Sequence, residues 1–207
     1  MCGNGCKTGT LKNQLKNCNV VVRISATQMF VMVLKSGIFP QQAPKLVCGK
    51  MDLTEGGIRV PWLAHWPRQI PAGGVSHQHC MTMDWSTTLL DIGGGQPHPD
   101  HPPDGVSLRS VLQDPAISFE RPMHWRMKHR QQRATRLGRW KYLKVDEHEY
   151  LFDISQDARE RANLAQRHPE RLSAMRDAWL AWDATLPPIP PDATVSLGYS
   201  VKDMPQR

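Results

Sequence analysis

Lys50 is one of the residues whose type could take part in chemistry. It stands five residues before the turn Glu55-Gly56-Gly57, whose glycines allow the backbone to pack closely. The ammonium group of a lysine is a flexible point charge that pairs with negatively charged oxygens. Without further context, a lysine beside a turn is usually a solvated surface residue.

Two other sets of residues resemble metal ligands. They are His98, Asp100, His101 and Asp104 in one loop, and the C-x-x-x-C pair Cys2 and Cys6. The first set lies among four prolines without helical or strand spacing, which favours a solvated loop. The cysteine pair lacks a second pair of matching ligands, so we expect no zinc site.

Residues 126–141 hold seven Lys and Arg residues around Trp125 and Trp140, a pattern also found in nucleic-acid-binding surfaces. A basic binding module is therefore an alternative, although we expect no nucleic-acid partner. Glu55 and Asp84 favour structural roles over acid–base catalysis. Glu55 is in a turn, and Asp84 is placed to cap a helix.

The elements that must position these residues follow from local patterns. The expected elements are a strand covered on both faces at 58–66, a helix at 83–92, a helical turn at 106–112, strands at 123–127, 134–145 and 150–154, and a helix at 169–186. Residues 19–34 suit either a strand or a short buried helix. Gly138 predicts a hairpin turn within 134–145.

The helix at 169–186 has the clearest pattern in the chain. Leu172, Met175, Trp179 and Trp182 form one apolar stripe at spacings of three and four residues. Pro169 suits the first turn of a helix, where a missing N–H costs least. We expect the stripe to pack on an antiparallel sheet formed by residues 123–154.

Charge divides the 207-residue chain unevenly. Residues 1–49 hold six of the 26 Lys and Arg residues and none of the 19 acids, whereas the remainder is nearly balanced. The acid-free composition of residues 1–47 fits a frameshift or a misjudged start site. The most apolar stretch, 20–34, is interrupted by polar residues, so we expect no membrane span. The compartment is not indicated.

Six stretches, in order, carry a resemblance to a known family. They are 49–61 with Lys50, Glu55-Gly56-Gly57 and Arg59-Val60-Pro61; 66–73 with Trp66-Pro67 and Ile70-Pro71-Ala72-Gly73; 83–91; 104–108; 138–142; and 150–164 with Asp157, Glu160 and Asn163-Leu164. Together they resemble the C-terminal portion of a formylglycine-dependent sulfatase, or arylsulfatase, over residues 48–186. Thr87 and Ala158 stand where the family usually has proline.

The resemblance implies a partial alkaline-phosphatase-like α/β fold with a C-terminal antiparallel sheet and a packed helix. It implies the end of a catalytic domain at 48–95, a C-terminal subdomain at 96–186 and a proline-rich tail at 187–207. It also implies that Lys50 is catalytic, pairing with sulfate oxygens, and that the substrate is a sulfate ester. The basic stretch 126–141 would then lie near the substrate.

The family also uses Ca²⁺ or Mg²⁺ and a formylglycine made from Cys or Ser within Cys/Ser-x-Pro/Ala-x-Arg. This sequence contains no such stretch, and no acid precedes Asp52. A hard cation takes mostly carboxylate oxygens as ligands. We therefore expect no metal site and no cofactor in this chain, and no activity of the chain alone. The alternatives are a non-enzymatic remnant and the basic binding module.

Overall fold

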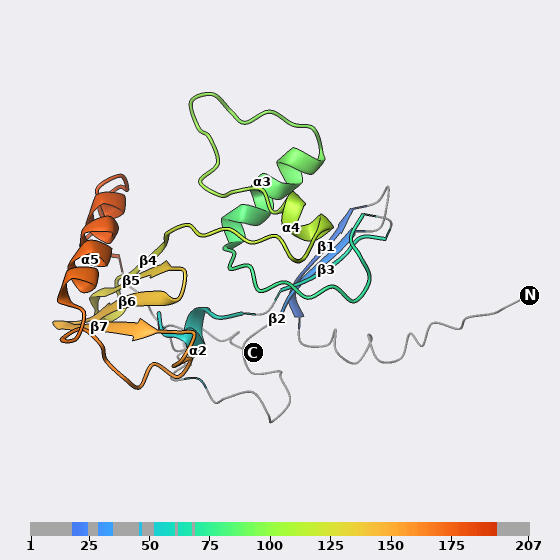
Figure 1. Cartoon of the computed structure of the whole chain (residues 1–207). Coiled ribbons are helices and arrows are strands. Elements are labelled where there is room, and N and C mark those ends of the chain that lie inside the picture. Colours follow the sequence, from blue (N-terminus) through green and yellow to red (C-terminus); the bar gives the residue numbers. More distant parts are fainter. Residues whose placement is uncertain are drawn as a thin grey trace, which may run out of the picture. The chain divides into compact units, whose positions relative to one another are not determined.

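The computed structural model describes residues 18–24, 29–34, 46, 52–60, 62–67 and 69–193, with the backbone alone in the first two ranges. The chain divides into two compact units (Figure 1). One comprises residues 1–43 and 59–121, and the other comprises 44–58 and 122–207. The predicted boundaries at 95/96 and 186/187 differ from this division. The end of a catalytic domain at 48–95 and the C-terminal subdomain at 96–186, both expected from the resemblance, stay predictions.

The first unit contains a three-stranded antiparallel sheet in the order β1-β2-β3. Its strands are β1 (Cys18–Ile24), β2 (Met29–Leu34) and β3 (Trp62–His65). Residues 19–34 were expected to form either a strand or a short buried helix, and their described parts, 19–24 and 29–34, belong to two paired antiparallel strands. The strand expected at 58–66 is shorter than predicted. Its burial alternates rather than continuing on both faces, with Leu63 47% exposed.

Two helices complete the described part of this unit, α3 (Thr82–Ile92) and α4 (Arg109–Gln113). The sequence predicted Asp84 as the cap residue of α3, and this prediction is wrong. The helix begins at Thr82, two residues before Asp84. Asp84 instead lies at the third helical position, where its carboxylate accepts the N–H of Met81 at 2.6 Å. It also accepts the N–H of Val106 at 3.0 Å and pairs with Arg121. Its predicted structural role therefore fits its contacts.

The second unit contains a four-stranded antiparallel sheet in the order β4-β5-β6-β7. The strands are β4 (Met123–Met127), β5 (Gln132–Leu137), β6 (Trp140–Val145) and β7 (His148–Asp153), with a single 3₁₀ turn, η2 (His129–Gln131), before β5. The predicted hairpin at Gly138 is present, and the φ of this glycine is +54°. Only a glycine adopts that conformation at little cost, which explains the turn.

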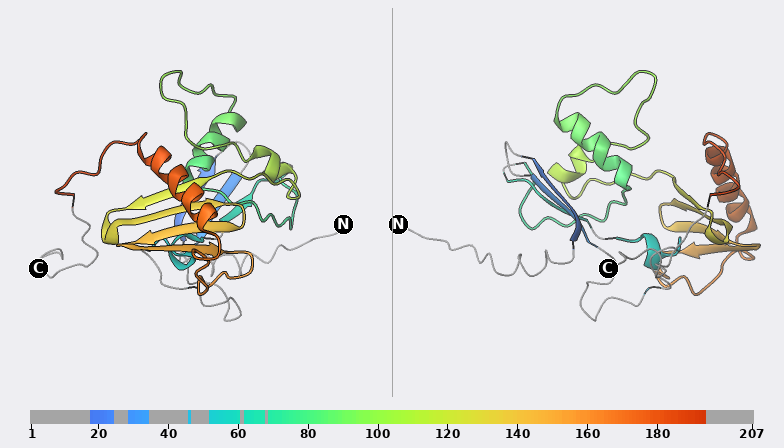
Figure 2. Two further views of the ribbon diagram at one scale, coloured as in Figure 1. Left: turned by 60° about the vertical axis from the view of Figure 1, so that its left-hand side comes forward. Right: turned by 180° about the vertical axis from the view of Figure 1, so that it is seen from behind.

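Helix α5 (Pro169–Asp183) lies across one face of this sheet (Figure 2). Pro169 is at its first turn, as predicted, and the helix ends three residues before the expected boundary. Met175 and Trp179 pack against Tyr142 and Leu151 of the sheet. The opposite face carries Leu143, Phe152 and other apolar residues of a second cluster, which also includes Leu53 and against which Ile58 of α2 (Glu55–Ile58) is packed. Alternation along β6 and β7 thus gives the sheet two buried faces.

An ion pair joins α5 to the sheet beside the apolar cluster. Glu149 on β7 accepts hydrogen bonds from Arg176 Nε at 2.9 Å and from the Tyr142 hydroxyl at 2.8 Å. The Arg176 guanidinium lowers the pKa of Glu149, whereas burial of Tyr142 raises the pKa of its phenol. The Glu149 carboxylate therefore stabilises the fold in its charged form.

We expect Glu149→Gln to cost about 1–2 kcal/mol near pH 6, because a hydrogen-bonded ion pair is lost. A carboxyl whose folded pKa is depressed stabilises above its unfolded pKa of about 4.3, and this stabilisation is lost as pH falls through the lower folded pKa. The gap between wild type and Glu149→Gln in urea unfolding should therefore narrow as pH falls below about 4 and close once pH lies below the folded pKa of Glu149. Glu147→Gln, at an 83% exposed side chain, is the control and should leave the pH profile unchanged.

Candidate functional site

Lys50, the predicted catalytic residue, lies outside the described residues. The structure does describe the segment that follows it, 52–58, which belongs to the same compact unit as the four-stranded sheet. The contacts of residues 52–58 therefore fix the backbone that follows Lys50. Its attachment has two parts, an apolar anchor and a buried charge network.

Leu53 is the apolar anchor. Its side chain is 3% exposed and packs with the buried residues of one sheet face, Ala134, Leu143, Phe152 and Ile154. Its N–H donates a hydrogen bond of 2.9 Å to Oε1 of Gln132, a side chain that is itself buried. The backbone two residues after Met51 is thus bonded directly to the first residue of β5. A buried N–H without such a partner would be costly, so this bond fixes the path of the segment.

Glu55 forms the centre of the charge network. Its carboxylate contacts Lys141 Nζ at 3.1 Å through Oε1 and Arg136 Nη1 at 3.2 Å through Oε2. The side chains of Glu55 and Lys141 are fully buried, and that of Arg136 is 9% exposed. Charges removed from water are tolerated only when they are paired closely. The first residue of α2 is therefore bound to both inner strands of the sheet.

Glu160 completes the network from the loop after β7. Its Oε1 lies 2.8 Å from Lys141 Nζ, and its Oε2 accepts the N–H of Glu55 at 2.7 Å. The backbone φ of Glu160 is +53°, which is uncommon for a residue with a side chain. Burial raises the pKa of Glu160, and the neighbouring Lys141 ammonium opposes that shift. Two carboxylates and two cations balance, so the network carries no net charge.

This arrangement favours a positioning role over acid–base chemistry. The Glu55 carboxylate has no solvent exposure and two cationic partners, so a substrate proton could not reach it without unfolding the contact. The sequence interpretation of Glu55 as structural agrees with this geometry. Sequence reasoning missed Lys141 and Glu160 as its partners. Both lie in stretches that carry the family resemblance, which was the signal available.

The basic stretch 126–141 does not form the open wall of charge that the sequence suggested. Five of its seven cations pair with carboxylates: Arg126 with Asp183, Arg130 with Asp146, Arg136 with Glu55, Arg139 with Asp153, and Lys141 with Glu55 and Glu160. Lys128 donates to the carbonyls of Pro190 and Pro191, and Arg133 stacks on Trp179 at 4.6 Å. Their charge is used within the fold, which weakens the case for a nucleic-acid patch.

The candidate metal ligands lie in an exposed loop or outside the described residues. Within the ranges that the structure describes, no three His, Cys, Asp or Glu side chains are grouped so as to hold a metal ion. The loop residues His98, Asp100, His101 and Asp104 are exposed, and the rings of His98 and His101 stack at 5.1 Å. Cys2, Cys6 and Cys48 lie outside the described residues, and Cys80 is an exposed free thiol.

Known sulfatases are similar to this chain over part of its length. An N-acetylgalactosamine-6-sulfatase of Sus scrofa is 42% identical over 79 residues, covering 38% of this chain and 15% of that protein. An uncharacterized sulfatase of Schizosaccharomyces pombe is 31% identical over 147 residues, covering 64% of this chain and 26% of that protein. The chain thus spans well under a third of the length of these relatives. No protein-family model matches it.

Solved structures give the same result for the fold. A crystal structure of Ps i-CgsB matches with a TM-score of 0.58 and 27% identity, covering 67% of this chain and 32% of that one. The partial alkaline-phosphatase-like α/β fold predicted from the sequence is confirmed, with its C-terminal antiparallel sheet and packed helix. No helix in the described part of the chain combines the length and apolar character that crossing a bilayer requires.

Proposed function

We propose, from the premise that residues 48–186 are the C-terminal portion of a sulfatase, that this sequence serves sulfate-ester hydrolysis and that Lys50 binds a sulfate oxygen. One observation supports the assignment of this role to Lys50. The segment beginning two residues after Lys50 is fixed to the sheet by Leu53, Gln132 and the buried charges around Glu55. A rigid attachment of this kind suits a residue that must meet its substrate precisely.

The chemistry asks for a cation of this type. Transfer of a sulfuryl group spreads negative charge over the peripheral oxygens of sulfate, and a preplaced ammonium stabilises that charge as it develops. In this proposal Lys50 orients the sulfate and lowers the barrier electrostatically, while the Glu55 network positions the backbone that follows it. The Sus scrofa relative is named for a sulfated amino sugar, so a sulfated sugar is the substrate class that we favour.

The family's metal and formylglycine do not fit the residues of this chain. The described acids Glu55, Asp84 and Glu160 are already bound to cations or backbone N–H groups, and the described residues form no ligand cluster. When present in a sulfatase, the formylglycine supplies the nucleophile and the metal activates it. We infer that these groups come from polypeptide beyond this sequence and that the chain alone does not hydrolyse sulfate esters.

The experiment begins with the DNA around and upstream of codons 1–50, read in all three frames for Cys/Ser-x-Pro/Ala-x-Arg and an Asp-Asn pair. The product of a restored frame should hydrolyse 4-nitrophenyl sulfate. Lys50→Ala should lower its kcat/KM by about 100-fold, comparable to removing one preorganised donor to a developing oxyanion. Lys144→Ala is the control, since Lys144 pairs with an exposed carboxylate at 3.7 Å and should have little effect.

Two results would contradict the proposal. The first is hydrolysis by the present chain alone, which would show that its own residues supply the nucleophile. The second is a restored product in which Lys50→Ala retains wild-type kcat/KM. Upstream frames that encode neither motif would favour the non-enzymatic remnant.

A further inference from the structure

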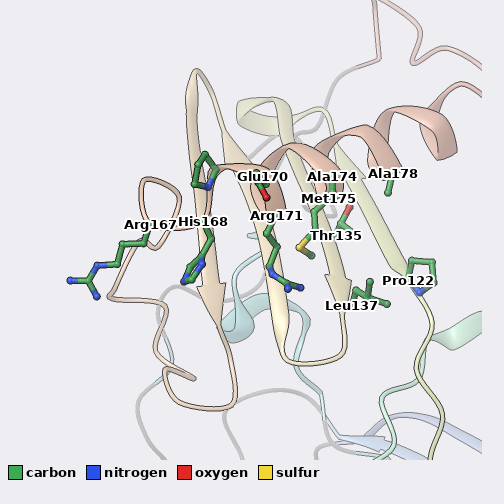
Figure 3. A pocket seen from close by; sticks show the side chains of 11 residues that line it. Pro122, Thr135, Leu137, Arg167, His168, Glu170, Arg171, Ala174, Met175 and Ala178 are labelled. Atoms are coloured by element: carbon green, nitrogen blue, oxygen red, sulfur yellow. The ribbon is translucent and has the colours of Figure 1, made fainter.

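A groove of about 670 Å³ lies between the beginning of α5 and the strand β5 (Figure 3). It is on the face of the sheet opposite α2, since α5 and α2 pack against alternate residues of β6 and β7. Its volume is within the range of about 300–1,000 Å³ that holds small ligands. Nothing in the proposed role of Lys50 uses this groove.

Positive charge gathers at one end of the groove. Arg167, His168 and Arg171 line it, with Glu170 as the acid among the lining residues. Figure 3 shows the side chains of His168 and Arg171 extending from the start of α5 across the strands. Within the described part of the chain, neither Arg167 nor Arg171 has a carboxylate partner. Their charge is thus available to an anion, in contrast to the paired cations of 126–141.

Trp140 holds this cationic end in place. The guanidinium carbon of Arg171 is 4.7 Å from the centre of the Trp140 ring, that of Arg139 is 5.4 Å away, and the His168 ring meets it edge-on at 5.2 Å. The negative face of an indole attracts cations and orders them. Arg139 is neutralised by Asp153, so Arg171 remains the ordered guanidinium without an anion. A guanidinium fixed in this way is preorganised to bind a sulfate or carboxylate with two parallel hydrogen bonds.

The other end of the groove is apolar. It is lined by Pro122, Leu137, Ala174 and Ala178, and Leu137 is 39% exposed. Such a surface suits the apolar face of a sugar ring, and Glu170 can accept hydrogen bonds from sugar hydroxyls. No Trp, Tyr or Phe side chain lines the groove, and the nearby Trp140 ring is covered by Arg171 and Arg139, so the groove lacks a large aromatic platform for a nucleic-acid base.

We propose that this groove binds a sulfated oligosaccharide, with Arg171 holding one sulfate, Arg167 on the other side of His168 holding a second sulfate, and the Leu137 end holding a sugar ring. The choice of a sulfated sugar rests on the proposed function, whereas the anion site rests on the groove itself. A groove of this kind would hold a glycan chain on the sheet face away from α2. It adds a binding contact and no chemical step.

The test uses the complete 207-residue chain and isothermal titration calorimetry with chondroitin 6-sulfate hexasaccharide as the probe. Arg171→Gln and Arg167→Gln should each weaken binding about tenfold, because each removes a charge-assisted contact. Arg159→Gln is the matched control, an exposed arginine that does not line the groove, and should bind as wild type does. Unsulfated chondroitin hexasaccharide should bind at least about tenfold more weakly than the sulfated probe.

Several outcomes would overturn the inference. They are absence of binding, equal binding of both hexasaccharides, and binding that Arg171→Gln and Arg167→Gln leave unchanged. The inference would also be overturned, in favour of a general polyanion site, if an oligothymidine bound as tightly as the sulfated hexasaccharide and if Arg171→Gln and Arg167→Gln abolished that binding. Because Arg167 is an exposed side chain, its variant remains informative if Arg171→Gln does not fold.

Lys50→Ala separates this inference from the proposed function. Hexasaccharide binding that persists in Lys50→Ala supports the groove even if no restored frame hydrolyses a sulfate ester. Binding that is lost in Lys50→Ala but retained in both groove variants contradicts the groove and leaves the role of Lys50 standing.

Discussion

Lys141→Met should destabilise the second unit by about 3–5 kcal/mol, the cost of breaking a buried ion pair by removing one partner. Methionine keeps most of the length and the unbranched shape of the lysine side chain but carries no charge. The variant leaves Glu160 buried without a cation and leaves Glu55 with Arg136 alone. Urea unfolding followed by far-UV circular dichroism measures the loss.

Two further variants make this prediction specific. Arg130→Met removes a cation whose side chain is 53% exposed and pairs with the half-exposed Asp146, so it should cost less than about 1 kcal/mol. Adding Glu160→Gln to Lys141→Met should recover part of the loss, because the uncompensated charge is removed as well. Equal costs for Lys141→Met and Arg130→Met would show that the network contributes little.

The pH dependence of Lys141→Met gives an independent check. In the wild type burial raises the pKa of Glu160, and the Lys141 ammonium opposes that rise. Without Lys141 the pKa of Glu160 in the folded protein should rise further above its value in the unfolded chain. The stability lost in Lys141→Met is then largest above this folded pKa, where Glu160 is charged and buried. The loss becomes smaller as pH falls through the folded pKa, since the folded protein binds the proton more tightly than the unfolded chain does. The stability gap to wild type should therefore narrow toward acid pH.

Elements with strong local signals were predictable from the sequence. The strand at 123–127, the turn at Gly138 and the start of α5 at Pro169 all lie where periodicity and turn chemistry placed them. In each case the information lies within a few neighbouring residues: an apolar stripe, a glycine that adopts positive φ, or a proline at a first helical turn. The family resemblance supplied the fold class that these elements alone could not.

The charge network was not predictable in this way. Glu55 lies 81 residues from Arg136, 86 from Lys141 and 105 from Glu160 in sequence, and no periodic pattern connects positions so far apart. The same contacts explain the error at 58–66. Residues 55–58 form a helical turn, with the N–H of Ile58 bonded to the Thr54 carbonyl at 3.1 Å, and Glu55 at its start is bound to the sheet. Tertiary contacts therefore override the strand propensity of the beginning of that run.

The basic stretch 126–141 illustrates a related limit. A count of cations in sequence gives their number but not their partners, and five of the seven meet carboxylates only in the folded chain. Among the residues that line the groove, Arg167 and Arg171 have no carboxylate partner within the described part of the chain, and the sequence did not single them out. The location of free charge is thus a property of the fold and not of composition.

Trp179→Ala should cost about 3–5 kcal/mol, because it removes a buried indole between α5 and the sheet and leaves a cavity. Trp179 is 3% exposed and packs with Tyr142, Leu151 and Met175. Its indole N–H also donates to the Trp125 carbonyl at 2.8 Å, so the substitution leaves that carbonyl without its partner. Urea unfolding by circular dichroism, with amide hydrogen exchange of β4–β7, measures the effect without depending on tryptophan fluorescence.

The adjacent residue provides the matched control, since Leu180 is on the same helix but is 45% exposed. Leu180→Ala should cost less than about 1 kcal/mol, as expected for an exposed position. Trp179→Phe keeps an aromatic ring and loses the hydrogen bond to Trp125, so it should fall between the two. If Leu180→Ala were as costly as Trp179→Ala, α5 would bury a different face from the one described. The residues of α5 that line the groove beside Arg171 would then also differ. The packing of α5 and the proposed saccharide groove therefore depend on the same helix orientation.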